Sequence, residues 1–295
     1  MLLDCDMSQR LTEKHCFELQ HGNYKLYHVV KSGGSSTIYQ GEHIHLQHPV
    51  AVKVLNSWLA SEEVTHKFWA EARLHASMRH PHIVRVLDCG VKGKLPFFVM
   101  DYAPHGTLQD YYVTGSKLPL STLLPLVMQI ASALQYLHER NLVHRDVKPS
   151  NLLIGPENQI WLSDFGITVA MQPWHPQHMQ DSIGTALYAA PEQISGKPVT
   201  ASDQYALAVL VYTWLCGQPP FSGSLVQLCQ QHLYNEPPSL SKHLPQLAPA
   251  VEQVVLRALS KDPYQRFAHV LDFANALKQA CTQPLAREEP VGPGL

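Results

Sequence analysis

The spacing of apolar residues changes near Tyr102, and this change limits the folds open to the chain. Before it, short segments rich in β-branched and aromatic residues alternate with turn-forming residues, as strands do. A single helical pattern, residues 61–77, interrupts them, with Val64, Phe68, Glu71 and His75 on one face. The expected strands are Tyr24–Val30, Thr37–His43 and Val50–Leu55, and two further short apolar segments follow at Ile83–Leu87 and Phe97–Tyr102. Residues 23–101 are therefore predicted to form a small β-rich lobe with one helix.

After Tyr102 the apolar residues follow helical spacing. Leu123 to Leu137 mark a long buried face, and a loop-rich stretch covers residues 141–193. Further helices are expected at Ser202–Cys216, Leu225–Tyr234, Pro249–Leu259 and Val270–Ala280. The sequence thus predicts an α+β chain whose second lobe, residues 102–280, is mainly α-helical, with an unpatterned flank at 1–22 and a disordered tail at 281–295. A cleft between two such lobes is a natural ligand site.

Charge and cysteine spacing exclude several function classes. The formal charge of −2 gives no electrostatic argument for binding nucleic acid. The six cysteines lie far apart without a Cys-x-x-Cys pair, so reduced thiols in a cytoplasmic protein are expected rather than a zinc site. The longest near-apolar run, Ala206–Cys216, is shorter than the roughly 20 residues of a membrane span. We therefore expect no membrane anchor.

The residues that indicate chemistry lie in the loop-rich middle. His144-Arg145-Asp146-Val147-Lys148-Pro149-Ser150-Asn151 is followed by Asp164-Phe165-Gly166 and by Ala190-Pro191-Glu192, with Lys53 and Glu71 upstream. In this order and spacing the chain resembles the eukaryotic-type (Hanks-type) serine/threonine protein kinases, and its bacterial branch in particular. The resemblance covers about residues 24–280. It implies a bilobal protein kinase-like fold that uses ATP and Mg²⁺, with Mn²⁺ as an alternative, to phosphorylate serine and threonine residues of proteins, the kinase itself included.

Phosphoryl transfer requires charge neutralisation and positioning more than covalent chemistry. Asn151 and Asp164 supply the hard oxygen ligands that Mg²⁺ prefers. Asp146 can accept the proton of the substrate hydroxyl group or orient that hydroxyl group. Lys148 can neutralise the charge of the γ-phosphate. The alternative reading of Asp146 and Asp164 is a pair of loop-capping aspartates.

Strand alternation gives a role to Lys53. Ala51 and Lys53 share one strand face, so a small side chain can lie against adenine while the lysine reaches the α- and β-phosphates. Glu71, on the inner face of the predicted helix, fits as its counter-ion. Taken alone, the pair is also compatible with a solvated surface ion pair.

The phosphate loop departs from the family pattern. Aligned on Ile38, the stretch Lys31-Ser32-Gly33-Gly34-Ser35-Ser36 lies over the family's three-glycine motif and keeps only the middle glycine, Gly33. Backbone N–H groups of a small, flexible loop can still cradle phosphate. A hairpin turn without a ligand is the alternative.

The resemblance also assigns further residues to the nucleotide pocket and to the structural scaffold. Met100 stands at the gatekeeper position, and Asp101 and Ala103 stand at the hinge that contacts adenine. Ile38 and Leu153 are further nucleotide-binding positions. Met100 is equally compatible with an ordinary core position. Glu192 and Arg266 resemble a buried ion pair under the activation segment, and Asp203 the residue that tethers the catalytic loop. Thr185 is expected to bridge Asp146 and Lys148.

The resemblance also implies regulation through phosphate binding. Arg145 precedes the proposed base, as in relatives that bind a phosphorylated activation segment. Ser182 is our candidate for autophosphorylation, with Thr185 as a second.

Two rival functions remain open at this stage. The missing glycines allow a pseudokinase that signals by binding, and the shared nucleotide lobe allows a small-molecule phosphotransferase. The expected partners are protein substrates, with a monomer or weak self-association during autophosphorylation.

Overall fold

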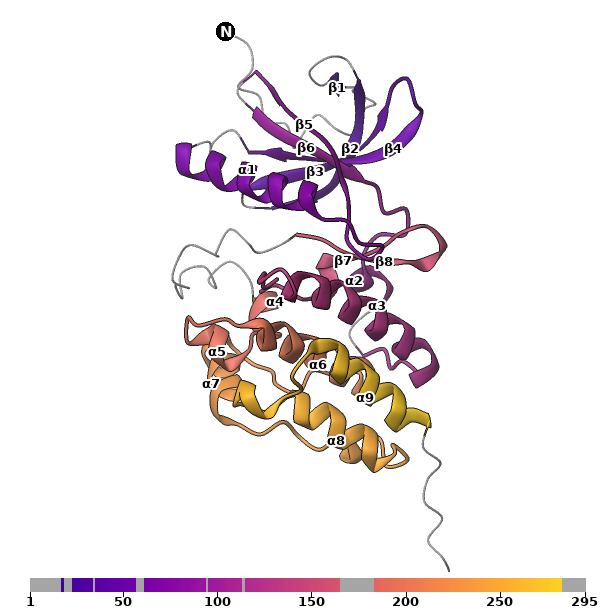
Figure 1. The fold of residues 1–295 in the computed structure, drawn as a ribbon, viewed down its shortest axis with the longest axis vertical. Helices are drawn as coiled ribbons and strands as arrows, with labels where there is room; N and C mark the ends of the chain where they lie inside the picture. Colours follow the sequence, from indigo (N-terminus) through magenta and orange to yellow (C-terminus); the bar gives the residue numbers. More distant parts are fainter. Residues whose placement is uncertain are drawn as a thin grey trace, which may run out of the picture. The chain divides into compact units, whose positions relative to one another are not determined.

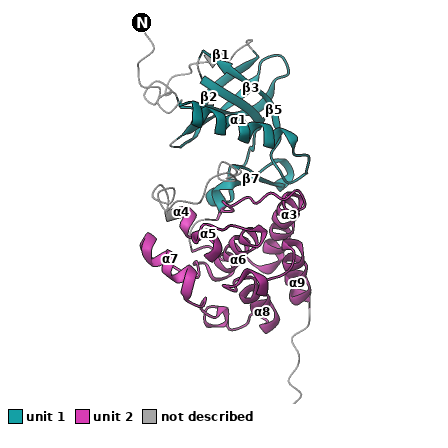
Figure 2. Cartoon of the chain, turned by 60° about the vertical axis from the view of Figure 1, so that its left-hand side comes forward, with its two compact units in different colours: residues 1–111, 149–172 teal, residues 112–148, 173–295 magenta. Residues whose placement is uncertain are grey.

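A computed structural model describes residues 17–18, 23–33, 35–56, 61–93, 95–112, 115–164 and 183–282. The chain divides into two compact units, coloured separately in Figure 2. Unit 1 contains residues 1–111 and 149–172, and unit 2 contains residues 112–148 and 173–295. A β-rich unit and a helical unit were predicted with a division after residue 101, but residues 102–111 and 149–164 also belong with the β-rich unit. The predicted tail lies outside the described residues from residue 283 onward, as does most of the predicted flank.

Unit 1 is built on an antiparallel sheet of order β1-β2-β3-β4-β6-β5. Its strands are β1 (Phe17–Glu18), β2 (Tyr24–Ser32), β3 (Ser36–His43), β4 (His48–Leu55), β5 (Val86–Lys92) and β6 (Leu95–Asp101). Two differences from the predicted elements stand out. Phe17–Glu18, inside the predicted flank, pairs with β2. The segment predicted at Ile83–Leu87 begins later, because Ile83 forms only an isolated bridge to Leu162.

The two faces of the sheet carry different cores, which confirms the predicted alternation along β4. Val50, Val52 and Val54 pack in one cluster with Tyr24, Leu26, Tyr39, Phe97 and Val99. Ala51 and Leu55 belong to a second cluster on the opposite face, which contains residues of the helix α1 (Glu62–Ser77). Figure 1 shows α1 lying along the sheet. The helix begins at Ser61, whose side chain accepts a hydrogen bond from Val64 N at 3.3 Å.

The β7–β8 hairpin explains why residues 149–164 join unit 1. Its elements are η3 (Pro149–Asn151), β7 (Leu152–Ile154), η4 (Pro156–Asn158) and β8 (Ile160–Leu162). Val84 N donates to Leu162 O at 3.1 Å, and Ile154 N donates to Gly106 O at 2.8 Å, next to α2 (Leu108–Tyr111). The spacing of apolar residues predicts local elements and not hydrogen bonds between distant segments, so the sequence did not predict these backbone bonds.

Unit 2 is helical. Its elements are α3 (Leu120–His138), α4 (Ile183–Ala186), α5 (Pro191–Ile194), α6 (Thr200–Cys216), α7 (Leu225–Tyr234), η7 (Leu240–Lys242), α8 (Pro249–Ala258), η8 (Pro263–Gln265) and α9 (Val270–Thr282). The helix α6 is buried on nearly all sides, which fits its apolar composition. It ends at Gly217, whose φ of 78° is left-handed. The predicted helices match these elements to within three residues at either end.

One helix among the described residues has the length and mean hydropathy of a membrane span, namely α3, at 1.4 over its most apolar window. Leu123, Val127, Ile130, Leu134 and Leu137 on this helix are buried. The helix packs against α6 and α9 within unit 2. Its apolar face therefore has a partner inside the helical core.

Candidate functional site

Lys53 lies between two carboxylates in unit 1. Its Nζ atom is 2.6 Å from Glu71 Oε1 and 3.2 Å from Asp164 Oδ1. The register of β4 and β6 sets Lys53 opposite Phe98, and the ammonium group lies 5.6 Å from the centre of that ring. The ion pair of Lys53 with Glu71 that the sequence predicts is present, and Asp164 joins it.

Burial and charge oppose each other in this group. Burial would lower the pKa of Lys53, but the Asp164 and Glu71 carboxylates outweigh it and hold that pKa above its ordinary value. Burial would likewise raise the pKa of Asp164, yet Lys53 and Lys31 keep it below its usual range. Burial raises the pKa of Glu71, with Lys53 acting against it. Two ammonium groups therefore hold Asp164 ionised.

Asn151 and Asp164 flank the β7–β8 hairpin. Ser163 N and Ser163 Oγ donate to the backbone oxygen of Asn151 at 2.9 and 3.1 Å, which ties the two ends of the hairpin together. Asp164 has a left-handed φ of 52°, an uncommon conformation for a residue other than glycine. These hydrogen bonds and the φ angle of Asp164 fix the backbone at both ends of the hairpin, where Asn151 and Asp164 lie.

The donor set fits a cation that a nucleotide brings with it. Asn151 offers an amide oxygen and Asp164 a carboxylate, both hard ligands. Within the described ranges, no three His, Cys, Asp or Glu side chains gather into a metal cage. Mg²⁺ commonly binds through one or two protein ligands together with phosphates and water, so the residues fit this ion.

The predicted adenine-contacting side chains meet in one apolar cluster of unit 1. Ala51 and Met100 are buried in it and face each other across β4 and β6, while Ile38 and Leu153 pack against it. Met100 therefore occupies a core position that also adjoins the other predicted pocket residues.

The predicted hinge residues Asp101 and Ala103 end β6 and follow it. Asp101 N donates to Arg85 O at 3.1 Å, so a contact with adenine from this residue would have to use its carbonyl oxygen. The Asp101 side chain accepts from Arg85 Nε at 2.8 Å and lines a cavity of about 650 Å³. Lys53, Glu71 and Asp164 do not line that cavity, which separates it from the charged group.

The phosphate loop is braced by a residue that sequence reasoning missed, Asn56. Its Nδ2 donates to Gly33 O at 3.0 Å, its Oδ1 accepts from Thr37 Oγ1 at 2.9 Å, and its N donates to Ser35 O at 2.9 Å. Gly33 N also donates to Ser36 O at 2.9 Å, which closes the turn between Ser32 and Ser36. The sequence signal that could have identified Asn56 is a polar residue directly after the buried strand β4. Gly34 lies outside the described residues.

In unit 2, Asp146, Lys148 and Thr185 form a closed triangle. Lys148 Nζ is 2.8 Å from Asp146 Oδ2 and donates to Thr185 Oγ1 at 2.8 Å. Thr185 Oγ1 in turn donates to Asp146 Oδ1 at 3.3 Å. The bridge predicted for Thr185 is present. Ser182, the other phosphosite candidate, lies outside the described residues, as does Phe165.

Asp203, at the start of α6, holds the backbone of this loop, as predicted. It accepts from His144 N and Arg145 N at 2.8 Å each, and from His138 Nε2 at 2.8 Å. Gln193 Nε2 donates to Arg145 O at 2.7 Å, a contact the sequence did not indicate. Arg145 has a φ of 69°, so these bonds fix a strained residue next to Asp146.

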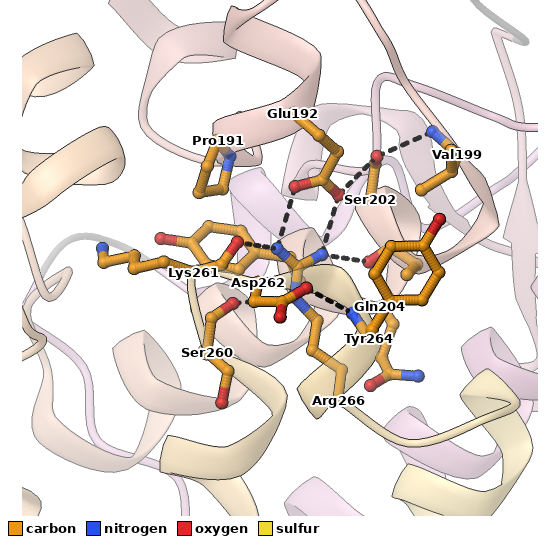
Figure 3. A network of polar contacts seen from close by, with 12 residues as sticks. Pro191, Glu192, Val199, Ser202, Gln204, Ser260, Lys261, Asp262, Tyr264 and Arg266 are labelled. Carbon is orange, nitrogen blue, oxygen red and sulfur yellow. Dashed lines mark hydrogen bonds and ion pairs between the residues drawn. The ribbon is translucent and has the colours of Figure 1, made fainter.

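Arg266 and Glu192 form the ion pair predicted for the scaffold. Figure 3 shows the guanidinium group at the centre of a polar network. Arg266 Nη1 and Nη2 donate to the two Glu192 carboxylate oxygens at 2.8 and 2.9 Å, and Nε donates to Ser260 O at 2.8 Å. Ser202 Oγ donates to Glu192 Oε1 at 2.7 Å. The network links α5, α6 and the loop before α9 within unit 2.

Comparison with known proteins agrees with these observations. The Protein kinase domain family matches residues 24–284 of the chain. The chain is 34% identical over 262 residues to the serine/threonine-protein kinase PrkC of Bacillus subtilis, covering 88% of this chain and 40% of PrkC. It is 36% identical over 253 residues to PknB of Mycolicibacterium smegmatis, covering 83% of this chain and 40% of PknB. PknL of Mycobacterium tuberculosis is 32% identical over 274 residues, with 92% of this chain and 68% of PknL covered.

Two of these relatives are much longer than the matched region. The chain spans about 40% of the length of PrkC and of PknB. The similarity therefore concerns the kinase domain, and the activities of the full-length relatives are not assigned to this chain.

Proposed function

Since this chain belongs to the protein kinase family, we propose that it transfers the γ-phosphate of ATP to serine and threonine hydroxyl groups of proteins, itself included. The observation that carries the proposal is Lys53, held 2.6 Å from Glu71 and 3.2 Å from Asp164. Burying a lysine and two carboxylates costs desolvation free energy that their attraction repays only in part, and such groups are frequent at functional sites. Binding the phosphates of a nucleotide is a function that such a lysine can serve.

Unit 1 supplies the nucleotide ligands in this proposal. Ala51, Met100, Leu153 and Ile38 surround adenine, the loop from Lys31 to Ser36 lies over the phosphates, and Lys53 contacts the α- and β-phosphates. Asn151 and Asp164 would hold Mg²⁺, or Mn²⁺ in its place. The ion, when bound, neutralises charge that develops on the phosphate oxygens.

Unit 2 supplies the groups for the acceptor. Asp146 is only half-buried and Lys148 and Thr185 fix its orientation, so its carboxylate can accept the proton of a serine or threonine hydroxyl. Lys148 adds a positive charge for the γ-phosphate. The pairing of Lys148 with Thr185 supports a serine/threonine acceptor over tyrosine.

Transfer of labelled phosphate tests the function. Purified protein incubated with γ-labelled ATP and Mg²⁺ should phosphorylate itself and a generic protein acceptor on serine and threonine. The variants Lys53→Met and Asp146→Asn should lose this label while keeping the wild-type circular dichroism spectrum. Nucleotide binding without any transfer would instead establish the pseudokinase, and label confined to small molecules would establish the phosphotransferase.

Regulation by a phosphate on the activation segment is part of the proposal. Among the described residues, the buried Nε of Arg145 has no hydrogen-bond partner, and burial lowers the pKa of this guanidinium. A phosphorylated Ser182 would offer the missing acceptor, with Thr185 as the second candidate. Phosphopeptide mapping after incubation with ATP tests this, and fully active enzyme with an unmodified Ser182 would contradict it.

We further propose that the chain works in the cytoplasm as a monomer that self-associates weakly during autophosphorylation, without a membrane anchor and without binding nucleic acid. Cys89, Cys216, Cys229 and Cys281, the cysteines that the structure describes, form no disulfide, which suits a reducing compartment. The packing of α3 against α6 and α9 suits a core helix. Cell fractionation and analytical ultracentrifugation test these points; recovery in the membrane fraction or a stable oligomer would contradict them.

A further inference from the structure

Lys31, which stands where the family's loop has its first glycine, lies on the same face of the sheet as Lys53. The register pairs Lys31 with Ile38 across β2 and β3, Ile38 with Lys53 across β3 and β4, and Lys53 with Phe98 across β4 and β6. Directly opposed residues of neighbouring strands point to the same face. The two lysines therefore belong to one row that crosses the sheet and extend toward the same side.

A β-bulge at Val30 puts Lys31 into this row. Val29 is opposite Tyr39, but the next partner, Ile38, is opposite Lys31 rather than Val30. Without the extra residue, Val30 would face Ile38 and Lys31 would point to the other side of the sheet. A bulge of this kind re-aims a side chain, and here the re-aimed side chain is a cation.

The two lysines together occupy both oxygens of the Asp164 carboxylate. Lys31 Nζ lies 3.2 Å from Oδ2, and Lys53 Nζ lies 3.2 Å from Oδ1. Their environments differ, because the Lys31 side chain is 45% exposed whereas that of Lys53 is 11% exposed. Lys53 also has Glu71 as a second partner, whereas within the described part of the chain Lys31 forms an ion pair with Asp164 alone. Lys31 is therefore the more easily displaced of the two.

We propose that Lys31 exchanges partners during nucleotide loading: it competes with divalent metal for Asp164 in the empty site and binds phosphate oxygens of ATP when the metal arrives. This inference rests on the proposed function and adds a residue to it. An ammonium group on Oδ2 repels a divalent cation and takes one of the oxygens the cation needs. Once displaced, the exposed end of Lys31 can turn to the triphosphate beside Lys53.

The exchange predicts changes of opposite sign when the charge of Lys31 is removed. In Lys31→Gln the dissociation constant for Mn²⁺ without nucleotide, measured by electron paramagnetic resonance, should fall by about fivefold, because the competing cation is gone. The dissociation constant for ATP at a saturating Mg²⁺ concentration, at which the metal has displaced Lys31 from Asp164, should rise by about fivefold, because one phosphate ligand is lost. General damage to the site would weaken both affinities, so the opposite signs identify charge competition.

Two further variants control the test. Lys31→Arg keeps the charge and should keep both wild-type dissociation constants to within about twofold. Lys25→Gln removes the same charge from an exposed position of the same strand and should leave both unchanged. Circular dichroism and the unfolding midpoint establish that each variant is folded.

The outcomes separate this inference from the proposed function. A wild-type chain that binds Mn²⁺ and ATP and transfers phosphate, together with a Lys31→Gln variant whose Mn²⁺ affinity is unchanged or weaker, overturns the exchange alone. An equal response from Lys25→Gln overturns it as well, since the effect would then reflect net charge. A folded wild-type chain that binds neither ligand overturns both.

Discussion

The charged groups of the two units are built differently. In unit 1, Asp164 is shared between Lys53 and Lys31, each at 3.2 Å, and its side chain is 26% exposed. In unit 2, the side chain of Arg266 is fully buried and donates to both oxygens of Glu192 and to the backbone oxygens of Ala201, Ser260 and Lys261. The first group consists of single contacts to a partly exposed carboxylate, and the second of many contacts to a buried cation.

This difference separates a site from a scaffold. Partners that are singly bonded and partly exposed can be replaced by a metal or by phosphate at small cost. A buried guanidinium whose donors are all satisfied cannot change partners without leaving charge uncompensated. We therefore expect substitution of Lys31 or Asp164 to affect chemistry while leaving the fold, and substitutions in the second group to affect the fold first.

Removing the proposed metal ligand should have the largest effect on activity. Asp164→Ala should lower the phosphotransfer rate by at least about a thousandfold, because the metal supplies several kcal/mol of charge stabilisation. Its unfolding free energy should fall by only about 1–2 kcal/mol, since Lys53 keeps Glu71 as a partner and the main cost is alanine at the left-handed φ of 52°. Single-turnover transfer and urea unfolding measure the two quantities. Normal turnover would remove Asp164 from the site.

Breaking the scaffold pair should give the reverse pattern. Arg266→Ala should lower the unfolding free energy by about 3–5 kcal/mol, because Glu192 is left without its buried partner. The exposed Arg140→Ala serves as a control, with an expected change below about 1 kcal/mol. A double variant with Glu192→Gln should recover part of the loss. A loss below about 1 kcal/mol in Arg266→Ala would show that the network does not stabilise unit 2.

His232 of α7 should make unit 2 sensitive to acid. Its Nδ1 is 2.9 Å from Tyr205 Oη, and burial, with the nearby Lys261 charge, lowers its pKa from 6.5 to about 4. The unfolded chain binds the proton first as pH falls, so the stabilisation is complete above about pH 6.5 and is lost down to about pH 4. The full loss is roughly 3 kcal/mol.

The comparison with His232→Gln isolates this contribution. The variant keeps an amide near Tyr205 but does not titrate, so its urea stability should change less than that of wild type between pH 6.5 and pH 4. Parallel stability curves for the two proteins would contradict the prediction.

Asn56 should contribute moderately to both stability and nucleotide binding. Asn56→Ala removes the bonds to Gly33 O and Thr37 Oγ1 and leaves a buried hydroxyl without that partner, which should cost about 1–3 kcal/mol of unfolding free energy. A looser loop should also weaken ATP binding several-fold, as measured by calorimetry. Asn56→Asp keeps the acceptor for Thr37 but sets a carboxylate oxygen against Gly33 O, which repels it, so this variant should loosen the loop more than Asn56→Ala does. Unchanged ATP affinity in both would exclude a role for the brace.

Local periodicity explains which parts of this fold could be predicted. Alternation along β4 set Ala51 and Lys53 on one face, and helical spacing set Glu71 on the inner face of α1. The ion pair of Lys53 with Glu71 could therefore be predicted from the sequence. The bulge at Val30 and the contact of Lys31 with Asp164 depend on strand register and on residues 133 positions apart. No local pattern encodes such a contact. The Asn56 brace was missed for the same reason, since its partners lie across the hairpin.

Substitution of Gly33 should have the smallest effect on stability and ATP binding, in contrast to substitution of Gly41 in the same unit. Gly33, the glycine of the family's loop motif that this chain keeps, has no left-handed φ, and an added Cβ would lie at an ordinary 3.4 Å from Ser36 O. Gly33→Ala should therefore change stability by less than about 0.5 kcal/mol and ATP affinity by less than about twofold. At Gly41 the added Cβ would lie only 2.5 Å from the backbone oxygen of Lys25, so Gly41→Ala should separate β2 from β3 and cost about 1–3 kcal/mol. Thermal unfolding and ATP titration of both variants measure the contrast. If Gly33→Ala were the more damaging, the loop would depend on glycine itself, and not on the Asn56 brace that we infer holds it in place.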